Sequence, residues 1–384
     1  MIPFNKIFLT GNEQKYINEA LISGKISGNG SFTKKCQNFF EKKYSFKKTL
    51  LTTSCTDALE MCAMLANLKE GDEVIIPSFT FVSTALAFLR TGAKVVFADS
   101  YADNPNIDPK GIERLINKKT KAIIVVHYAG IACDMDAIMS IANKNNLIVI
   151  EDAAHAIDSY YTDRKGVKKP LGSIGHLAAF SFHETKNIVS GEGGLLVIND
   201  DRFIERAEII WENGTNRSKF FRGEIDKYGW VDIGASFLAS DILAAFLWAQ
   251  LEAIDEIQAK RVALWNHYYE TITNSCTTPD FEIAPIPDYA SQNGHMFYLV
   301  AKNLKTRNKL LALFKNKGYH AVFHYSSLHK SSYYTNKHDS RILINSDRFS
   351  DCLIRLPLFV DLEFSTIDQM VADVLMDSYI KKVI

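Results

Sequence analysis

The sequence predicts an α/β fold built on a mostly parallel sheet of seven strands. Apolar runs of strand length alternate with amphipathic helical stretches between about residues 48 and 200, which is typical of a parallel sheet covered by helices on both faces. Polar residues directly follow several of these runs, and ligands bind such sheets at the carboxyl ends of the strands. At 384 residues the chain is also too long for one simple core, which predicts a second domain.

We expect strands and helices in a regular order. The seven expected strands are 48–52, 73–77, 94–98, 122–127, 147–151, 177–182 and 195–199, with helices at 57–68, 82–90 and 135–145. A long helix near 242–269 should lead to a C-terminal α+β unit with strands at 296–301 and 321–325 and helices at 305–317 and 365–375. The expected division is a large domain over 1–250 and a smaller one over 251–384.

Composition excludes several classes of protein. Lys plus Arg equals Asp plus Glu, so the formal net charge is zero, and nucleic acid or an anionic membrane would require a basic excess. No apolar stretch approaches the ~18 residues that span a bilayer, and the first residues lack the apolar core of a signal peptide. The six cysteines show no CxxC spacing, and no metal-ligand spacing is visible. We therefore expect reduced thiols in a cytoplasmic protein with no metal site.

Two residues point to a specific chemistry. Asp152 directly follows a buried apolar run, and Lys186 lies between a second apolar run and the glycine-rich segment 191–194. Pyridoxal phosphate chemistry requires a lysine that bonds covalently to the cofactor and a carboxylate that keeps its ring nitrogen protonated. Alone, Lys186 would be read as an exposed loop lysine and Asp152 as a helix N-cap. Together they predict a pyridoxal phosphate site.

Other residues near strand ends fit the same cofactor. Ser54, Cys55 and Thr56 follow a strand and open a helix, and the free N–H groups of a helix N-terminus suit a phosphate. Ser181 offers a further hydroxyl to that phosphate. The alternative for this segment is a simple N-cap.

Two ring side chains are candidates for contact with the cofactor ring. Phe81 follows the strand at 73–77 and would stack on one face of the ring, although aromatic residues there are more often part of the core. His155 lies one helical turn beyond Asp152. It would pack on the ring or reach its phenolic oxygen, and the alternative is a structural histidine.

A distinctive stretch at 213–223 combines cations with aromatic rings. Arg217 and Arg222 would hold a diphosphate, and Phe220 and Phe221 would stack on a base. The alternative is a solvated surface loop.

Three motifs, at 152–155, 180–187 and 191–194, resemble those of the DegT-type sugar-nucleotide aminotransferases, which are fold type I enzymes dependent on pyridoxal phosphate. The resemblance extends over nearly the whole chain. Segments 214–217, 230–234 and 321–325, with 183–187, are similar to one subgroup, the dTDP-4-amino-4,6-dideoxygalactose transaminases of enterobacterial common antigen synthesis.

This resemblance implies a homodimer with shared active sites and L-glutamate as amino donor. It assigns Lys186 to the covalent bond with pyridoxal 5'-phosphate, Asp152 to the ring nitrogen and Phe81 to ring stacking, with Cys55, Thr56 and Ser181 at the phosphate. It also implies substrate contacts for His324 and Tyr325. Many relatives supply a phosphate-binding asparagine from the partner subunit, and this sequence has Ser236 in that region.

The implied reaction is transamination of a dTDP-4-keto-6-deoxyhexose to dTDP-4-amino-4,6-dideoxygalactose for a cell-surface polysaccharide. Alternatives with the same chemistry are the 4-amino-4,6-dideoxyglucose epimer and a 3-keto sugar nucleotide. A non-catalytic protein that binds pyridoxal phosphate or a sugar nucleotide is an alternative from another class. A nicotinamide dehydrogenase is disfavoured, because Gly28-Asn29-Gly30 has no third glycine at the right spacing and no preceding strand.

Overall fold

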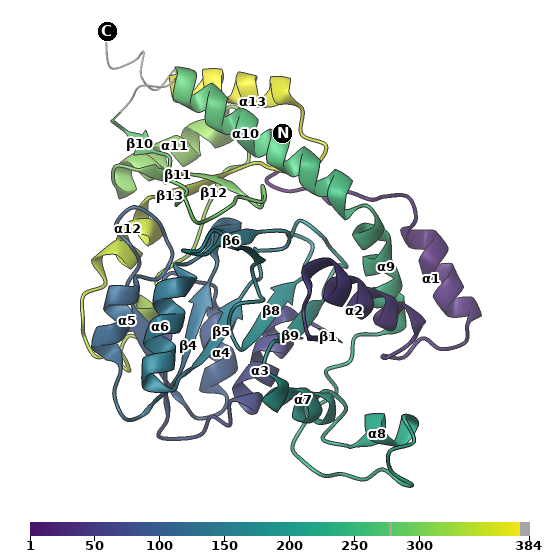
Figure 1. Cartoon of the computed structure of the whole chain (residues 1–384). Coiled ribbons are helices and arrows are strands. Elements are labelled where there is room, and N and C mark those ends of the chain that lie inside the picture. The colour runs from purple at the N-terminus through teal and green to yellow at the C-terminus, as the bar shows by residue number, and fades with distance from the viewer. Residues whose placement is uncertain (276–278, 377–384) are drawn as a thin grey trace.

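The computed structural model describes residues 1–275 and 279–376, and its large sheet has the predicted seven strands (Figure 1). Their order across the sheet is β1-β9-β8-β5-β4-β2-β3. The strands are β1 (Lys48–Thr52), β2 (Glu73–Pro77), β3 (Lys94–Ala98), β4 (Thr120–Val126), β5 (Ile148–Asp152), β8 (Leu177–Ser181) and β9 (Gly194–Ile198). The predicted α/β class and mostly parallel sheet are confirmed.

Strand direction brings several chain segments to one edge of this sheet. β2, β3, β4, β5 and β8 run parallel to one another, and β9 is antiparallel to both of its neighbours, β8 and β1. β1 and β8 therefore point the same way, and β9 begins where they end. Gly194 pairs with Thr52 on one side and with Ser181 on the other.

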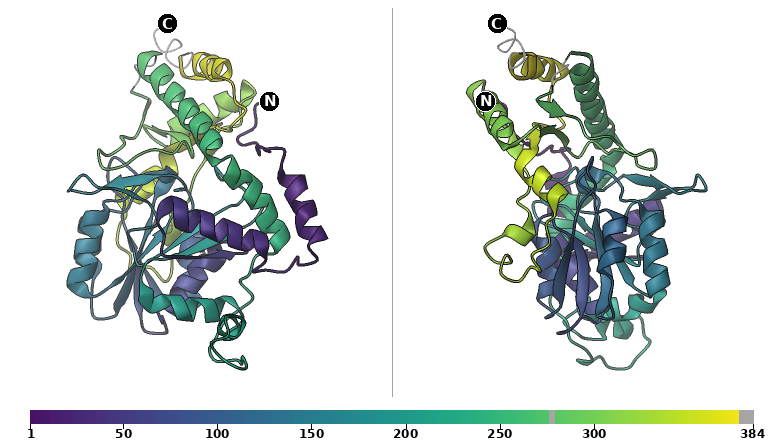
Figure 2. Two further views of the ribbon diagram at one scale, coloured as in Figure 1. Left: turned by 45° about the vertical axis from the view of Figure 1, so that its right-hand side comes forward. Right: turned by 90° about the vertical axis from the view of Figure 1, so that its left-hand side faces the viewer.

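Helices cover both faces of the large sheet, as the Figure 2 views show. The helices of this part are α1 (Glu13–Ile22), α2 (Ser31–Tyr44), α3 (Cys55–Leu65), α4 (Val82–Leu89), α5 (Pro109–Leu115), α6 (Met135–Asn145), α7 (Ile204–Trp211), α8 (Arg217–Phe221) and α9 (Asp241–Glu252). Successive strand residues enter different cores, because side chains alternate across a strand. Val149 packs with α2, α6 and α9, whereas Ile150 packs with α3, α4 and α7.

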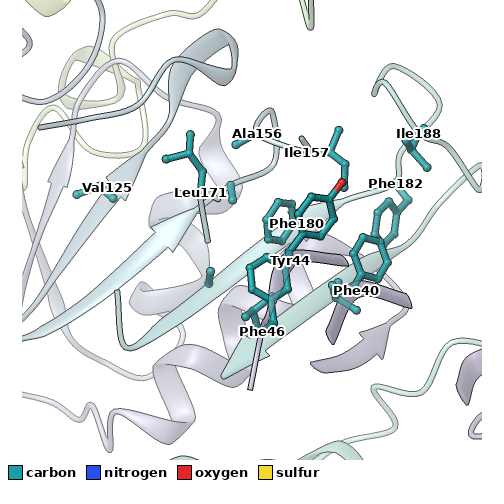
Figure 3. Close-up of a cluster of buried hydrophobic side chains, with 14 of the residues drawn as sticks. Phe40, Tyr44, Phe46, Val125, Ala156, Ile157, Leu171, Phe180, Phe182 and Ile188 are labelled. Atoms are coloured by element: carbon teal, nitrogen blue, oxygen red, sulfur yellow. The ribbon is translucent and has the colours of Figure 1, made fainter. Parts of the chain in front are cut away.

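Aromatic rings fill much of the first of these cores (Figure 3). Phe40 of α2 stacks on Phe182 just past β8, with ring centroids 5.6 Å apart. Phe46 lies 5.8 Å from Phe180 of β8. This packing anchors the end of β8, from which the Lys186 segment continues.

A smaller antiparallel sheet, in the order β10-β11-β13-β12, forms the C-terminal part. Its elements, and a separate hairpin of β6 and β7, are β6 (Tyr160–Thr162), β7 (Lys168–Pro170), α10 (Ile254–Ser275), β10 (Phe281–Glu282), β11 (Phe297–Ala301), α11 (Leu304–Asn316), β12 (Val322–Phe323), α12 (Ile344–Cys352), β13 (Leu353–Leu356), α13 (Phe364–Met370) and a π-helical turn at Val371–Met376.

The expectation of one long helix over 242–269 is wrong, because two helices occupy this region. α9 ends at Glu252 and α10 begins at Ile254. Ala253 between them leaves helical geometry, with φ −100° and ψ 9°. Ile257 of α10 packs in the large core and Tyr268 in the small one. We propose that the domain boundary lies at this junction, close to the predicted position after residue 250.

The N-terminal segment ties the small sheet to the loop that carries Lys186. The Ile2 N–H donates to the Gly318 carbonyl at 2.8 Å, and the Phe4 carbonyl accepts from the Leu358 N–H at 3.3 Å. Asn5 Nδ2 then donates to the carbonyl of Glu184, at 3.0 Å.

Over residues 1–275 and 279–376, no helix has the length and apolarity needed to cross a bilayer. Cys36, Cys55, Cys62, Cys133 and Cys352 are free thiols, and Cys276 lies outside the described residues.

Candidate active site

A cavity of about 550 Å³ lies between the carboxyl edge of the large sheet and the small sheet. This volume suits a cofactor together with the reacting part of a substrate. Ten of the predicted site residues line it, namely Ser54, Cys55, Thr56, Phe81, Asp152, His155, Ser181, Lys186, His324 and Tyr325.

Lys186 lies in a tight loop between β8 and β9. The Phe182 N–H donates to the Gly193 carbonyl at 2.9 Å, and the Glu184 N–H to the Gly191 carbonyl at 3.0 Å. Burial lowers the pKa of Lys186 to about 8. Its amine is thus more often neutral near pH 7 than a solvated lysine, which suits a nucleophile and a proton carrier.

Asp152 is the last residue of β5 and is buried at 4% exposure. Its Oδ2 accepts a hydrogen bond of 2.6 Å from the Thr84 hydroxyl of α4, and its Oδ1 accepts one of 3.2 Å from the Ala154 N–H. Burial raises the pKa of Asp152, and these two donors and Lys186 oppose the rise. No helix begins at residues 153–159, so Asp152 is not a helix N-cap. A buried carboxylate with these donors suits a cationic ring nitrogen.

Glu151, the neighbour of Asp152, points to the opposite face of the sheet and holds a second buried network. It accepts a bond of 2.9 Å from His127 Nε2 and further bonds from the N–H groups of Gly172 and Ile174. Because His127 Nδ1 accepts from the Cys133 N–H, the His127 ring donates to Glu151 through Nε2. Burial opposes ionisation of Glu151, but these donors outweigh it and lower its pKa.

The N-terminus of α3 forms a cradle that fits a phosphate. Both interpretations of Ser54 hold: it lines the cavity, and its Oγ caps the helix by accepting from the Asp57 N–H at 3.1 Å. The N–H groups of Cys55 and Thr56, in the first turn, have no intrahelical acceptor and lie at the cavity. A Cβ on Gly194 would stand 2.3 Å from the Ser54 carbonyl carbon, so glycine is needed for this close approach.

His155 is held neutral beside the cavity. Its Nδ1 accepts from the Ala129 N–H at 3.3 Å, so its proton is on Nε2. Its ring stacks on His295 with centroids 4.4 Å apart. Burial, with Lys186 and the neighbouring histidines, keeps the pKa of His155 well below its usual range. Such an Nε2–H group can donate to a phenolate oxygen.

Phe81 is at the N-cap position of α4, is 54% exposed as a residue and lines the cavity. Its ring lies beside that of Tyr325, with centroids 5.9 Å apart. One face of Phe81 is thus available to a planar ligand.

The lining residues that sequence reasoning missed include Thr84, His295 and Arg355. Thr84 is a polar residue in the apolar helix α4. Arg355 is the only charged residue of the apolar run 353–360. For Thr84 and Arg355 the available signal was a polar residue that interrupts an apolar element.

The five remaining predicted residues, Arg217, Phe220, Phe221, Arg222 and Ser236, do not line this cavity. They belong to an excursion over residues 212–236 that includes α8 and projects from the large sheet (Figure 1). Arg222 pairs with Glu208 at 2.8 Å and with Glu224 at 2.6 Å. Arg217 lies over the Phe221 ring, and Ser236 is exposed.

Solved structures with the same fold cover almost all of the chain. Protein Spr1654 of Streptococcus pneumoniae in its PLP form is 24% identical, covers 100% of this chain and 99% of its own, and has a TM-score of 0.88. PseC of Helicobacter pylori, an aminotransferase of pseudoaminic acid biosynthesis, is 24% identical over 98% and 99%, with a TM-score of 0.87. DesV of S. venezuelae is 25% identical over 98% of each chain, with a TM-score of 0.86.

Family membership agrees with the geometry of the cavity. A model of the DegT/DnrJ/EryC1/StrS aminotransferase family matches residues 8–375. The predicted cofactor, pyridoxal 5'-phosphate, is confirmed. The cavity offers donors that suit its phosphate, a carboxylate that suits its ring nitrogen and an amine that suits its aldehyde. The chain belongs to the DegT/DnrJ/EryC1/StrS aminotransferase family.

Proposed function

We propose that this aminotransferase acts on a dTDP-4-keto-6-deoxyhexose with L-glutamate as amino donor. The product would be dTDP-4-amino-4,6-dideoxygalactose, made in the cytoplasm for a lipopolysaccharide O-antigen or enterobacterial common antigen. The observation that carries the proposal is a partly exposed Lys186 in the same cavity as the buried carboxylate of Asp152. The sugar-nucleotide assignment is supported by the subgroup motifs, among them His324 and Tyr325 at the cavity.

Different residues of the cavity would bind different parts of the cofactor. Bound pyridoxal phosphate supplies an electron-withdrawing ring next to the carbon that gains or loses a proton. Asp152 would keep the ring nitrogen protonated, and the N–H groups of Cys55 and Thr56, with the Ser181 hydroxyl, would hold the phosphate. Phe81 would cover one face of the ring.

Lys186 would carry the proton in both half reactions. As a neutral amine it takes the proton from the α-carbon of glutamate, and as an ammonium it delivers a proton to the carbon at the former keto position. A pKa lowered to about 8 by burial supports both roles. The configuration of the new stereocentre depends on the face that Lys186 meets.

We also propose a homodimer in which the 212–236 excursion reaches the partner's cavity. Large apolar side chains of this excursion are exposed, including Phe221 at 67%, Trp230 at 84% and Ile233 at 65%. Several large exposed apolar side chains on one segment support an interface there. Arg217, Phe220, Phe221, Arg222 and Ser236 would then act on the substrate or phosphate bound by the other subunit.

The absorbance spectrum of the purified holoenzyme tests the proposal. L-Glutamate should remove the visible band, and dTDP-4-keto-6-deoxyglucose should restore it. Loss of the band without return would reject this sugar and keep the aminotransferase. In the NMR spectrum of the product, the proton couplings distinguish the galactose from the glucose epimer. In a 3-amino product the new amine would be on the neighbouring carbon. No change with any donor would favour a non-catalytic binding protein.

A further inference from the structure

One histidine nitrogen in the active-site cavity has no hydrogen-bond partner. His295 lies two residues before β11, is 4% exposed and lines the cavity. Its Nε2 is buried and has no partner within residues 1–275 and 279–376, so the Lys186 amine does not reach it either. Buried polar atoms are nearly always paired in native proteins. An unpaired one at a ligand cavity therefore indicates a ligand group that pairs with it.

The neighbours of His295 determine what this nitrogen can do. Asn187 donates from Nδ2 to the Asn293 carbonyl and to Gln258 Oε1, both at 2.9 Å. Because a carbonyl can only accept, the Asn187 amide has its Oδ1 toward His295, where it accepts from Nδ1 at 2.8 Å. Burial, with the nearby charge of Lys186, keeps the pKa of His295 well below its usual range. The ring is therefore neutral, and Nε2 carries a lone pair and no proton.

The two stacked histidines of the cavity differ in the group that they offer. His155 has its proton on Nε2, and its ring centroid is 4.4 Å from that of His295. This Nε2–H suits the phenolate oxygen of the cofactor. A phenolate has no hydrogen to donate, so it cannot pair with His295. The lone pair of His295 needs a ligand group that donates.

Among the ligands of a sugar aminotransferase, the sugar is the one with such a group to spare. The phosphate and phenolate of the cofactor accept hydrogen bonds, and we assign its ring nitrogen to Asp152. The amino donor has carboxylates, which accept, and an amine, which is the group transferred. A keto sugar has hydroxyl groups that take no part in the reaction, and each of them can donate.

The position of His295 indicates which hydroxyl this is. Lys186 is close enough to help lower the pKa of His295, so the lone pair lies near the reacting carbon. In a 4-keto-6-deoxyhexose one neighbour of the keto carbon carries a hydroxyl, and the other carries the methyl group. The donors of the nucleotide are separated from the keto carbon by the diphosphate and the sugar ring.

We propose that Nε2 of His295 accepts a hydrogen bond from the 3-hydroxyl of the sugar, on the carbon next to the keto carbon. This inference rests on the proposed 4-keto sugar substrate. His295 is then a specificity-determining residue, because a sugar without this hydroxyl would leave the buried lone pair unpaired. The bond also orients the sugar ring beside Lys186, since Asn187, the next residue in the chain, holds the histidine.

The experiment compares two sugars in the second half reaction. The holoenzyme is first treated with L-glutamate, and the return of the visible band is then followed in a single turnover. The probes are dTDP-4-keto-6-deoxyglucose and its 3-deoxy analogue, dTDP-4-keto-3,6-dideoxyglucose. In the wild type the analogue should react about tenfold more slowly, which corresponds to the loss of one hydrogen bond between neutral groups.

Two substitutions separate the two nitrogens of His295. His295→Asn keeps an amide where Nδ1 lies, so it can still donate to Asn187, but it has no group at the Nε2 position. The rate with the 3-hydroxy sugar should fall about tenfold, and the difference between the two sugars should disappear. His295→Gln places an amide oxygen near the Nε2 position and should reduce this difference without removing it.

His329→Asn is the matched control. His329 is also 4% exposed, and its Nδ1 lies 2.7 Å from Ser78 Oγ, but it does not line the cavity. The ratio of the two rates in this variant should equal that of the wild type. If His295→Asn does not fold, the ratios in the wild type and in His295→Gln carry the test.

Each contrary outcome has a distinct meaning. If the wild type converts both sugars at the same rate, the inference is wrong and the proposed function stands, and a bound water would complete His295. If His295→Asn slows both sugars equally, the residue has only a structural role and the inference is also wrong. If the wild type converts neither sugar, the proposed substrate fails together with this inference.

Discussion

The Thr84 hydroxyl donates a hydrogen bond of 2.6 Å to Oδ2 of Asp152 and so connects α4 to the carboxyl end of β5. Both side chains are buried, so the bond is not in competition with water. It stabilises the ionised form of Asp152, whose pKa burial raises. Thr84 is thus a positioning residue for the carboxylate that we assign to the ring nitrogen.

Thr84→Val should weaken binding of pyridoxal phosphate about tenfold, because a charge-assisted hydrogen bond is lost and ionisation of Asp152 becomes less favourable. The measurement is the cofactor Kd from a titration of the apoprotein. Thr84→Ser retains the hydroxyl and should restore most of the affinity. Equal weakening in both variants would indicate lost packing rather than a lost donor.

Lys186→Ala should abolish transamination and leave the fold unchanged, since Lys186 is in a loop and is only partly buried. Turnover with L-glutamate and the far-ultraviolet circular dichroism spectrum are the two measurements. Full activity in this variant would remove the central assignment of the site.

The rate at which apoprotein bonds to added pyridoxal phosphate should rise with pH and reach half its maximum near pH 8. Only the neutral amine reacts, and the pKa of Lys186 is lowered to about 8, whereas an ordinary lysine titrates near ~10.4. Stopped-flow absorbance across pH 6–11 would measure this midpoint. In Arg355→Met it should shift upward, because a cation that lowers the pKa has been removed. A midpoint above pH 10 in the wild type would contradict the proposed environment.

Glu151→Gln should lower the free energy of unfolding by about 2–3 kcal/mol at pH 7, because a buried network loses its charge. The folded-state pKa of Glu151 is lowered. Its contribution is therefore fully present above the unfolded pKa of ~4.3 and is lost as pH falls through the lower folded value. Urea unfolding at several pH values should show the difference from wild type shrinking only in acid. A difference that is constant with pH would mean that ionisation of Glu151 is not involved.

Gly194→Ala should disrupt the phosphate cradle, because the added Cβ would meet the Ser54 carbonyl carbon at 2.3 Å and the Cys55 nitrogen at 2.5 Å. We expect a lower melting temperature and a loss of cofactor affinity of at least about tenfold. Gly111→Ala is the control, since a Cβ there meets no atom within 4 Å. Unchanged cofactor affinity in Gly194→Ala would show that α3 does not hold the phosphate.

Strand-length apolar runs made the large sheet predictable. Because its parallel strands end at one edge, Asp152 and Lys186 were expected to lie near one another. Short elements were not predictable in the same way. The expected strand at 321–325 contains β12 (Val322–Phe323), but β13 was not predicted. β13 has four residues, so pairing with distant segments decides its structure and no local period reveals it. Arg355 was missed for this reason. The break at Ala253 was missed because the apolar pattern continues through it into α10.

The predicted diphosphate contacts show a different limit. Composition alone gives two arginines and two rings at 217–222. It does not reveal that Arg222 pairs with Glu208, fourteen residues earlier in the chain. Residues that come together from separate elements, such as Thr84 and Asp152, are also set by the tertiary fold.

The N-terminal segment has a practical consequence for anyone who expresses this enzyme. The Met1 side chain is 91% exposed, so a purification tag can extend from it into solvent. Phe4 lies over Arg355, and Asn5 holds the carbonyl of Glu184 in the Lys186 loop. Trimming the first ten residues would therefore uncover the guanidinium and loosen the loop. We therefore expect removal of these residues to change the activity of the enzyme.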